Sequence, residues 1–229
     1  AWEYLYTNTY SNTPGCAMHI PDAFIPIEQA LAYWVIALIF IALSLRWARR
    51  SMVEEKVPLV AVLAAGIFAI QALEIPIPWG TSGHMIGAAL AAIVLGSPFA
   101  GVFVLTLVIL VQALVFGDGG ITVMGANIID MGVVGGFVGY YGYTAVMGIA
   151  KNPYVAAFIA GWASLFISAT LVAGQLAIAG TFPLDIGLAF MAGYHAVIGL
   201  IEGGITAVAL YLIASARPDI LERSTEVTA

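Results

Sequence analysis

The sequence predicts an all-α integral membrane protein, a bundle of about seven transmembrane helices with its N-terminus outside and its C-terminus in the cytoplasm. The first observation behind this prediction is composition: of 229 residues, 62% are hydrophobic and 9% are charged, and the mean hydropathy is +1.03. Soluble domains carry roughly 25% charged residues, so this chain cannot cover an ordinary aqueous surface. The other two observations are the recurrence of long apolar stretches and the one-sided distribution of positive charge.

The apolar stretches are long enough for membrane helices, which need about 20 apolar residues. Seven can be drawn, near residues 30–47, 57–77, 84–96, 98–116, 124–149, 153–179 and 187–215. The third has about 13 residues, and we expect it to be tilted or partly buried by its neighbours. Short connections that carry Gly or Pro separate the stretches.

The orientation follows from the positions of the Lys and Arg residues. All seven lie after the first, fifth or last stretch: Arg46, Arg49, Arg50, Lys56, Lys151, Arg217 and Arg223. With seven spans these places share one side of the membrane, and the positive-inside rule makes that side cytoplasmic. His19 and His84 then lie on the exterior side, which carries several acids and no Lys or Arg.

The chain divides into an exterior N-terminal extension (1–17), which is either processed or not native, a transmembrane domain (18–217) and a cytoplasmic tail (218–229). The single cysteine, Cys16, excludes an internal disulfide and a cysteine metal cluster. No basic stripe suggests nucleic-acid binding. No HExxH, GxSxG or Walker A motif is present. We therefore expect no enzyme activity, and any ATP hydrolysis must occur in separate subunits.

The Met18-His19 pair suggests a metal site, because imidazole binds Ni, Co, Cu and Zn. When histidine is the second residue of a chain, the terminal amine, the histidine amide nitrogen and its Nδ1 can chelate one ion. Ni(II) and Cu(II) promote the necessary loss of the amide proton. His84, on the same side, could supply a fourth nitrogen. The alternative is that both histidines are ordinary interfacial side chains.

Several motifs resemble one family in the same order along the chain. They are MHIPDAFIP at 18–26, the block at 76–127 with its Gly-His turn and FGDGG, and HAVIGLIEGGIT at 195–206. The sequence is similar, from Met18 to about Arg217, to the CbiM/NikM family. These proteins are the substrate-binding membrane components of energy-coupling factor (ECF) importers for cobalt and nickel.

The resemblance implies a square-planar nitrogen site. Met18 would give its α-amine, His19 its amide nitrogen and imidazole, and His84 the fourth nitrogen. It implies no intrinsic cofactor, with Ni²⁺ or Co²⁺ as the transported ligand. The implied partners are the lipid bilayer of the cell membrane, a transmembrane coupling (T) subunit and two ATPase subunits, and a small accessory membrane subunit is a further option.

The residues before Met18 depart from the family pattern, because an acylated nitrogen cannot serve as the amine ligand. Three explanations are open: the extension is removed, translation starts at Met18, or this protein binds metal differently. Cleavage after Cys16 would place His19 third, which also gives a four-nitrogen chelate. In an intact chain the Cys16 thiolate could itself be a ligand.

Other polar residues have possible supporting roles. Candidates for contacts around the metal ligands or for a lid are Asp22, Ser82, Asp118 and Asn127, because a ligating histidine usually donates its second N–H to an acceptor. Asp118 could equally be a turn residue. His195 and Glu202 lie two helical turns apart on one face, roughly 10 Å along the axis, and we expect both to satisfy neighbouring helices rather than handle the ion.

The resulting hypothesis is a component that captures Ni(II) or Co(II) from outside for an ATP-driven importer. One alternative is a binding component of the same broad fold for an organic solute such as a vitamin. The other is a non-transporting membrane subunit that stores or senses metal or scaffolds a complex. Ligand type does not decide between nickel and cobalt.

Overall fold

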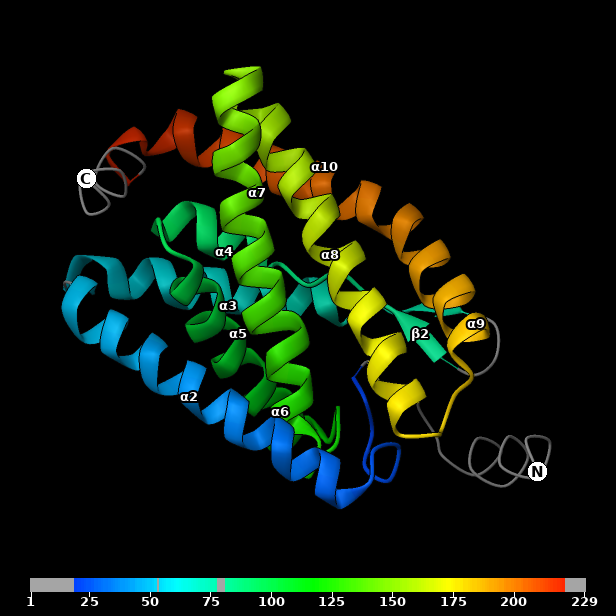
Figure 1. The fold of residues 1–229 in the computed structure, drawn as a ribbon. Helices are drawn as coiled ribbons and strands as arrows, with labels where there is room; N and C mark the ends of the chain where they lie inside the picture. Colours follow the sequence, from blue (N-terminus) through cyan, green and yellow to red (C-terminus); the bar gives the residue numbers. More distant parts are fainter. Residues whose placement is uncertain (1–18, 53, 78–80, 221–229) are drawn as a thin grey trace.

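The structure is a computed structural model that describes residues 19–52, 54–77 and 81–220. It is a helical bundle with one small hairpin at one end (Figure 1). The helices are α2 (Ile27–Ser51), η1 (Glu54–Lys56), α3 (Val57–Gln71), α4 (Ala88–Leu95), α5 (Pro98–Val111), α6 (Met124–Asn127), α7 (Gly135–Ala150), α8 (Pro153–Ile178), α9 (Leu184–Gly187) and α10 (Gly193–Ala216). Wider π-type turns, η2 (Gln112–Phe116), η3 (Ile128–Val134) and η4 (Leu188–Ala192), continue α5 or join α6 to α7 and α9 to α10.

Among the described residues, five continuous helices are long and apolar enough to cross a membrane. They are Ile27–Ser51, Pro98–Phe116, Met124–Ala150, Pro153–Ile178 and Leu184–Ala216. The protein is therefore a multi-pass membrane protein. The boundaries at 98 and 153 follow from local chemistry, because proline favours the first helical turn. The side chains of Ser97 and Asn152 cap these two helices by accepting backbone N–H groups.

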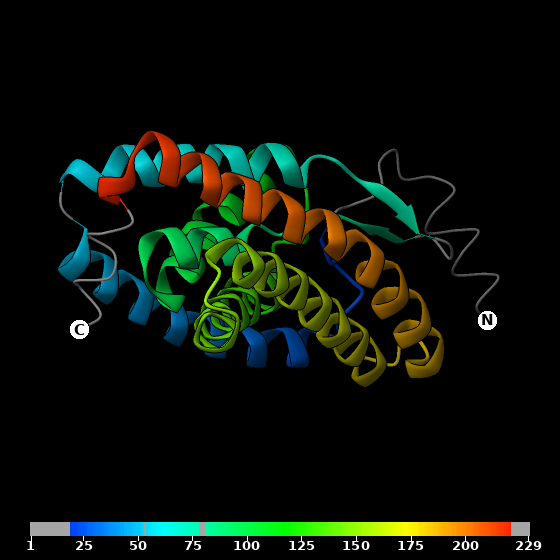
Figure 2. The same ribbon diagram turned by 90° about the horizontal axis from the view of Figure 1, so that it is seen from above.

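Two of the predicted stretches differ from the structure. The stretch 57–77 is not one helix: α3 ends at Gln71, and Ile75–Ile77 forms strand β1, which pairs antiparallel with β2 (Thr81–Gly83). The stretch 84–96 is helical only in α4, so the prediction that His84 begins a helix is wrong. Residues 84–87 instead run as a non-helical segment from β2 into α4. Figure 2 shows the hairpin at one end of the bundle, on the same side as the start of α10.

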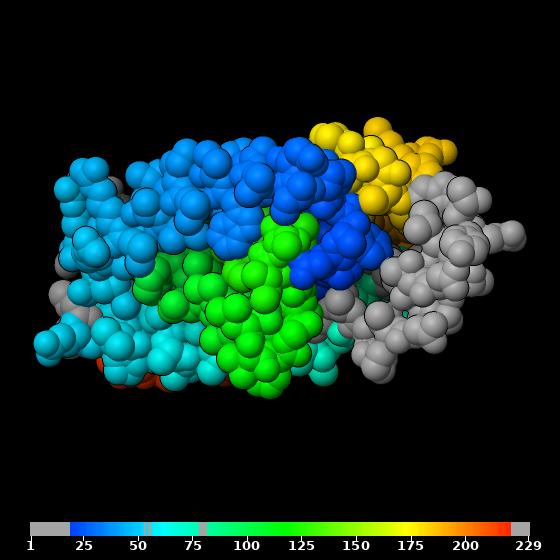
Figure 3. All heavy atoms as spheres, turned by 90° about the horizontal axis from the view of Figure 1, so that it is seen from below, coloured from blue at the N-terminus to red at the C-terminus, as the bar shows by residue number. Residues whose placement is uncertain are grey.

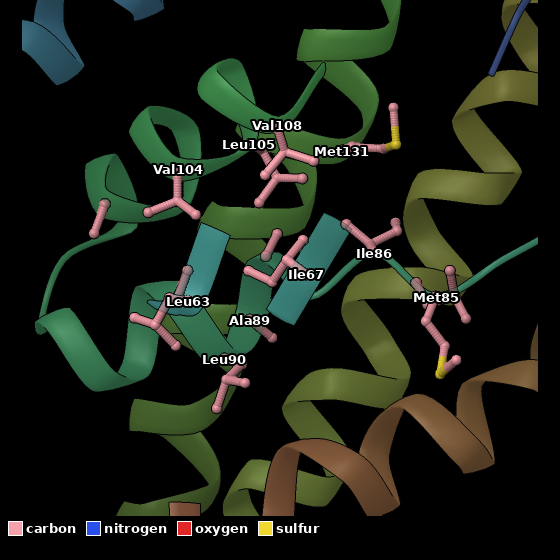
Figure 4. Close-up of a cluster of buried hydrophobic side chains, with 14 of the residues drawn as sticks. Leu63, Ile67, Met85, Ile86, Ala89, Leu90, Val104, Leu105, Val108 and Met131 are labelled. Atoms are coloured by element: carbon pink, nitrogen blue, oxygen red, sulfur yellow. The ribbon is translucent and has the colours of Figure 1, made fainter. Parts of the chain in front are cut away.

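Helix α4 forms the centre of the bundle, and all eight of its residues are buried. It packs against α5, α7, α8 and α10. Side chains of α3 and α5, among them Ile67 and Leu105, complete the surrounding core (Figure 4). A helix that is apolar on every side is expected only where no side faces water, and α4 meets this condition because its neighbours enclose it.

Small residues allow the close approach of these helices. A Cβ atom added at Gly139 of α7 would lie 2.6 Å from the Cβ of Ala89 in α4. One added at Gly136 would lie 2.9 Å from the carbonyl oxygen of Pro98. A Cβ at Gly203 of α10 would collide with the carbonyl oxygen of Phe158 in α8. Tight packing therefore explains these glycines.

This packing predicts opposite effects for two glycines of the same helix. Gly139→Ala should lower the thermal unfolding midpoint, because its methyl group would meet α4 backbone and overpacking costs about 1 to 3 kcal/mol. Gly148→Ala is the matched control, since nothing lies within 4 Å of its added Cβ and alanine gains about 1 kcal/mol of helix propensity. Thermal unfolding in detergent compares them, and an equal midpoint for both variants would contradict the packing.

Candidate metal site

The described chain begins with a segment, residues 19–26, that is tied to the connection before α6. The Ile20 N–H donates to Oδ1 of Asn127 at 3.0 Å, and Asn127 Nδ2 donates back to the Ile20 carbonyl at 3.2 Å. The Gly120 N–H donates to the same carbonyl at 3.0 Å. Figure 3 shows this blue segment lying against the green residues near position 120. The amide of Asn127 thus fixes the backbone of Ile20, the residue that directly follows His19.

Asp22 makes the second attachment. Its carboxylate accepts the backbone N–H of Thr122 at 2.9 Å and that of Ile121 at 3.3 Å, and it also accepts the Thr122 hydroxyl. Ile20 and Ile25 are buried in a small apolar cluster with Ala30, Val123 and Ala126. The N-terminal segment is therefore held by hydrogen bonds at Ile20 and Asp22 and by a core of its own.

The FGDGG motif at 116–120 packs directly against this segment. Gly117 has φ +67° and terminates η2. Gly119 has φ +87°, and a Cβ atom there would lie 2.8 Å from the Cβ of His19. A Cβ at Gly120 would collide with Asp22. Glycine is needed here both for the positive φ and for the close approach of the His19 segment.

His19 is buried, and its imidazole makes one hydrogen bond. Nδ1–H donates to Oδ1 of Asp118 at 3.2 Å. Among the described residues, the buried Nε2 has no hydrogen-bond partner, which is costly for a polar atom. Imidazole nitrogens are ligands that Ni, Co, Cu and Zn accept.

His84 lies next to His19, with the two ring centres 5.1 Å apart and the ring planes inclined by 54°. The His84 Nδ1–H donates to the carbonyl of Met85 at 2.8 Å. In the neutral ring this hydrogen bond places the lone pair on Nε2. The second N–H of a ligating histidine is usually fixed in this way.

The spacing of the two rings fits one shared ion. A metal–imidazole bond is about 2 Å long, so rings in adjacent positions of a square plane have centres roughly 4.5 to 5 Å apart. In the chelate of a second-position histidine, the fourth ligand lies opposite the amide nitrogen and hence adjacent to the imidazole. In residues 19–52, 54–77 and 81–220, no three His, Cys, Asp or Glu side chains are placed to hold one ion. The described side chains therefore offer the ion two imidazole ligands, those of His19 and His84.

The remaining predicted residues are Ser82, Glu202 and His195. Ser82 is buried in β2, opposite Pro76 and two residues before His84. Glu202 accepts backbone N–H groups from Ile86 at 3.0 Å and from Gly87 at 2.8 Å. His195 is buried on the same helix, and its Nδ1–H donates to the Met191 carbonyl at 2.7 Å.

Two residues outside the predicted set contribute to the surroundings of the site. Burial raises the pKa of the Glu74 carboxyl, the negative charge of Asp118 raises it further, and His19 opposes the rise. Gln71 at the end of α3 donates to the Ile86 carbonyl at 2.8 Å. The sequence shows that Gln71 is an amide side chain in an otherwise apolar stretch, but it does not show that Ile86 is its hydrogen-bond partner. Met18 and Cys16 lie outside the described residues.

Comparison with known proteins identifies the kind of molecule that carries this site. Residues 19–220 match the family model CbiM, described as the cobalt uptake substrate-specific transmembrane region. The chain belongs to this family. Its relatives include a protein of Haloquadratum walsbyi described as a metal transport protein, which is 45% identical over 89% of this chain and 93% of its own length.

Two further similar proteins are a nickel transport protein and a transporter of known crystal structure. A fused nickel transport protein NikMN of Archaeoglobus fulgidus is 41% identical over 90% of this chain and 68% of its own length. The crystal structure of a truncated transition metal transporter superposes with a TM-score of 0.82 at 29% identity, covering 86% of this chain and 98% of that chain. CbiM components belong to cobalt transporters that contain other subunits.

Proposed function

We propose that this CbiM-family protein captures Ni(II) or Co(II) at the exterior face for an ATP-driven ECF importer. The observation that carries the proposal is the buried His19–His84 pair, with ring centres 5.1 Å apart. The two histidines come from segments 65 residues apart in sequence, and tight packing and hydrogen bonds bring them together.

The proposed ligand set combines these rings with backbone nitrogens. Met18 gives its α-amine, His19 its amide nitrogen and Nδ1, and His84 its Nε2. Because His19 Nδ1 contacts Asp118 in the structure, we propose that metal binding replaces this hydrogen bond. The Met18 nitrogen must be a free amine, so the native chain begins there or is processed to that residue.

The exterior location of the site is supported by the positive charges at the opposite helix ends. The helices α2, α7 and α10 begin beside the site or continue turns that begin there, and they end next to Arg50, Lys151 and Arg217 respectively. If the positive ends are cytoplasmic, then the site faces outward. The acids Asp22, Glu74 and Asp118 near the site give an approaching cation a favourable potential.

The protein itself is proposed to act by binding rather than by catalysis. ATP hydrolysis is assigned to two separate ATPase subunits, and a transmembrane coupling subunit is assigned the transfer of the resulting motion. No intrinsic cofactor is needed, because the ion is the cargo.

Metal titration of the purified protein tests this function. We expect tight binding of one Ni(II) or Co(II) per chain, with the absorption of a square-planar nitrogen complex for Ni(II). Affinity should fall as pH decreases, since amine, amide and imidazole must all lose protons. The intact mass and N-terminal residue are measured on the same sample. Absence of tight binding by a chain that begins at Met18 would favour the organic-solute alternative.

A further inference from the structure

The segment that carries His84 lies along helix α10 and is bound at its far end by a side chain of that helix. At one end, the backbone of Gly83 approaches α10 so closely that an added Cβ would lie 2.6 Å from Cδ1 of Ile198 and 3.0 Å from Nε2 of His195. At the other end, Glu202 accepts the N–H groups of Ile86 and Gly87. His84 lies between these two contacts.

The backbone of Ile86 is fixed on both sides of its Cα. Its N–H donates to Glu202, and its carbonyl accepts Gln71 Nε2 at 2.8 Å. Gln71 is itself held by Gln112, whose Nε2 donates to Gln71 Oε1 at 2.9 Å. Side chains from α3, η2 and α10 therefore fix the backbone of one residue, two positions after His84, within an apolar bundle.

This arrangement exceeds what packing alone requires. A buried carboxylate is expensive within a membrane, whereas an apolar side chain at position 202 would fill the same space. The carboxyl group instead accepts two backbone hydrogen bonds. Both go to the segment of His84, at the start of α4, where backbone N–H groups lack helical partners.

We propose that Glu202, together with Gln71, is a positioning residue that fixes the direction in which His84 presents its imidazole to the ion. This inference rests on the proposed function. It assigns to α10 a direct hold on a metal ligand, and it connects the site at the end of the bundle with the middle of the last membrane helix.

Two variants test the proposal with measurements on metal-free and metal-loaded protein. Glu202→Gln keeps the shape but places an NH₂ group against one of the two N–H groups. Gln71→Met keeps the length but leaves the Ile86 carbonyl without its donor. Ser168→Ala is the control, because it removes one equally buried hydrogen bond, to the Asp130 carbonyl, far along the chain from the His84 segment.

We expect Glu202→Gln to raise the Ni(II) dissociation constant at least tenfold and to weaken the square-planar absorption. In metal-free protein, hydrogen exchange at Ile86 and Gly87 should become at least tenfold faster. Ser168→Ala should change neither quantity while lowering the unfolding midpoint similarly. Gln71→Met should show the same pattern as Glu202→Gln, and it decides the matter if Glu202→Gln does not fold.

Two results would overturn the inference: unchanged exchange at Ile86 and Gly87, or faster exchange with unchanged Ni(II) affinity. Failure of the proposed function looks different, because wild-type protein itself would then bind neither Ni(II) nor Co(II). In that case the positioning role falls with it, while faster local exchange would still show that Glu202 holds the segment.

Discussion

Replacing His84 with alanine should abolish tight Ni(II) binding and the absorption of the square-planar complex. The variant loses one of four nitrogen ligands, and loss of even a supporting partner of a ligand costs about 10- to 100-fold in affinity. We therefore expect affinity to fall by more than about 100-fold. Titration of metal-free protein with Ni(II), followed by absorption, measures the effect.

His19→Ala should have the same effect, because it removes the imidazole that faces His84 at 5.1 Å between ring centres. Asn152→Ala is the control for stability. The Asn152 side chain caps α8 by accepting the N–H groups of Tyr154 and Val155. Loss of this cap should cost about 1 kcal/mol of stability. Asn152 lies at the opposite end of the bundle, and its replacement should leave Ni(II) affinity intact. If both histidine variants bind Ni(II) normally, the metal site lies elsewhere.

Gly119→Ala should also weaken Ni(II) binding, although residue 119 is no ligand. The new methyl group would lie 2.8 Å from His19 Cβ, so His19 must shift from its position beside His84. A displacement of the ligand by a few tenths of an ångström should cost at least tenfold in affinity, or about 1.4 kcal/mol. The same Ni(II) titration measures it.

Gly117→Ala separates this displacement from backbone strain. Gly117 also has positive φ, at +67°, but nothing lies within 4 Å of an added Cβ. Both variants pay about 1 to 2 kcal/mol for a left-handed alanine, and the clash with His19 adds to this cost in Gly119→Ala, so the unfolding midpoint of Gly119→Ala should fall further. Only Gly119→Ala should lose metal affinity. Equal affinity losses would mean that loop strain, and not contact with His19, controls the site.

The helices that the sequence predicts best are those with local signals at their ends. Proline and a capping side chain at Ser97 and Asn152 make the starts of α5 and α8 readable. The end of α3 has no such signal: after Gln71 the chain is still largely apolar, yet it turns into β1. The pairing of β1 with β2 depends on a partner strand, which periodicity alone does not reveal.

The site shows the same division between local and distant information. The paired chemistry of Met18 and His19 is a local pattern, and with His84 it suggests a metal site. The link from Glu202 to Ile86 joins residues 116 positions apart. From the sequence, Glu202 can be recognised as an expensive buried acid, but its partners are backbone amides, which carry no sequence signal.

The enclosed helix α4 has a consequence for the order in which the protein is made. Eight residues span about 12 Å, well short of the roughly 30 Å hydrocarbon core, so α4 cannot hold a transmembrane position alone. The helices that enclose it, α5, α7, α8 and α10, all follow it in the chain. Helix α4, and His84 just before it, can therefore reach their final places only after the ribosome has delivered the last membrane segment.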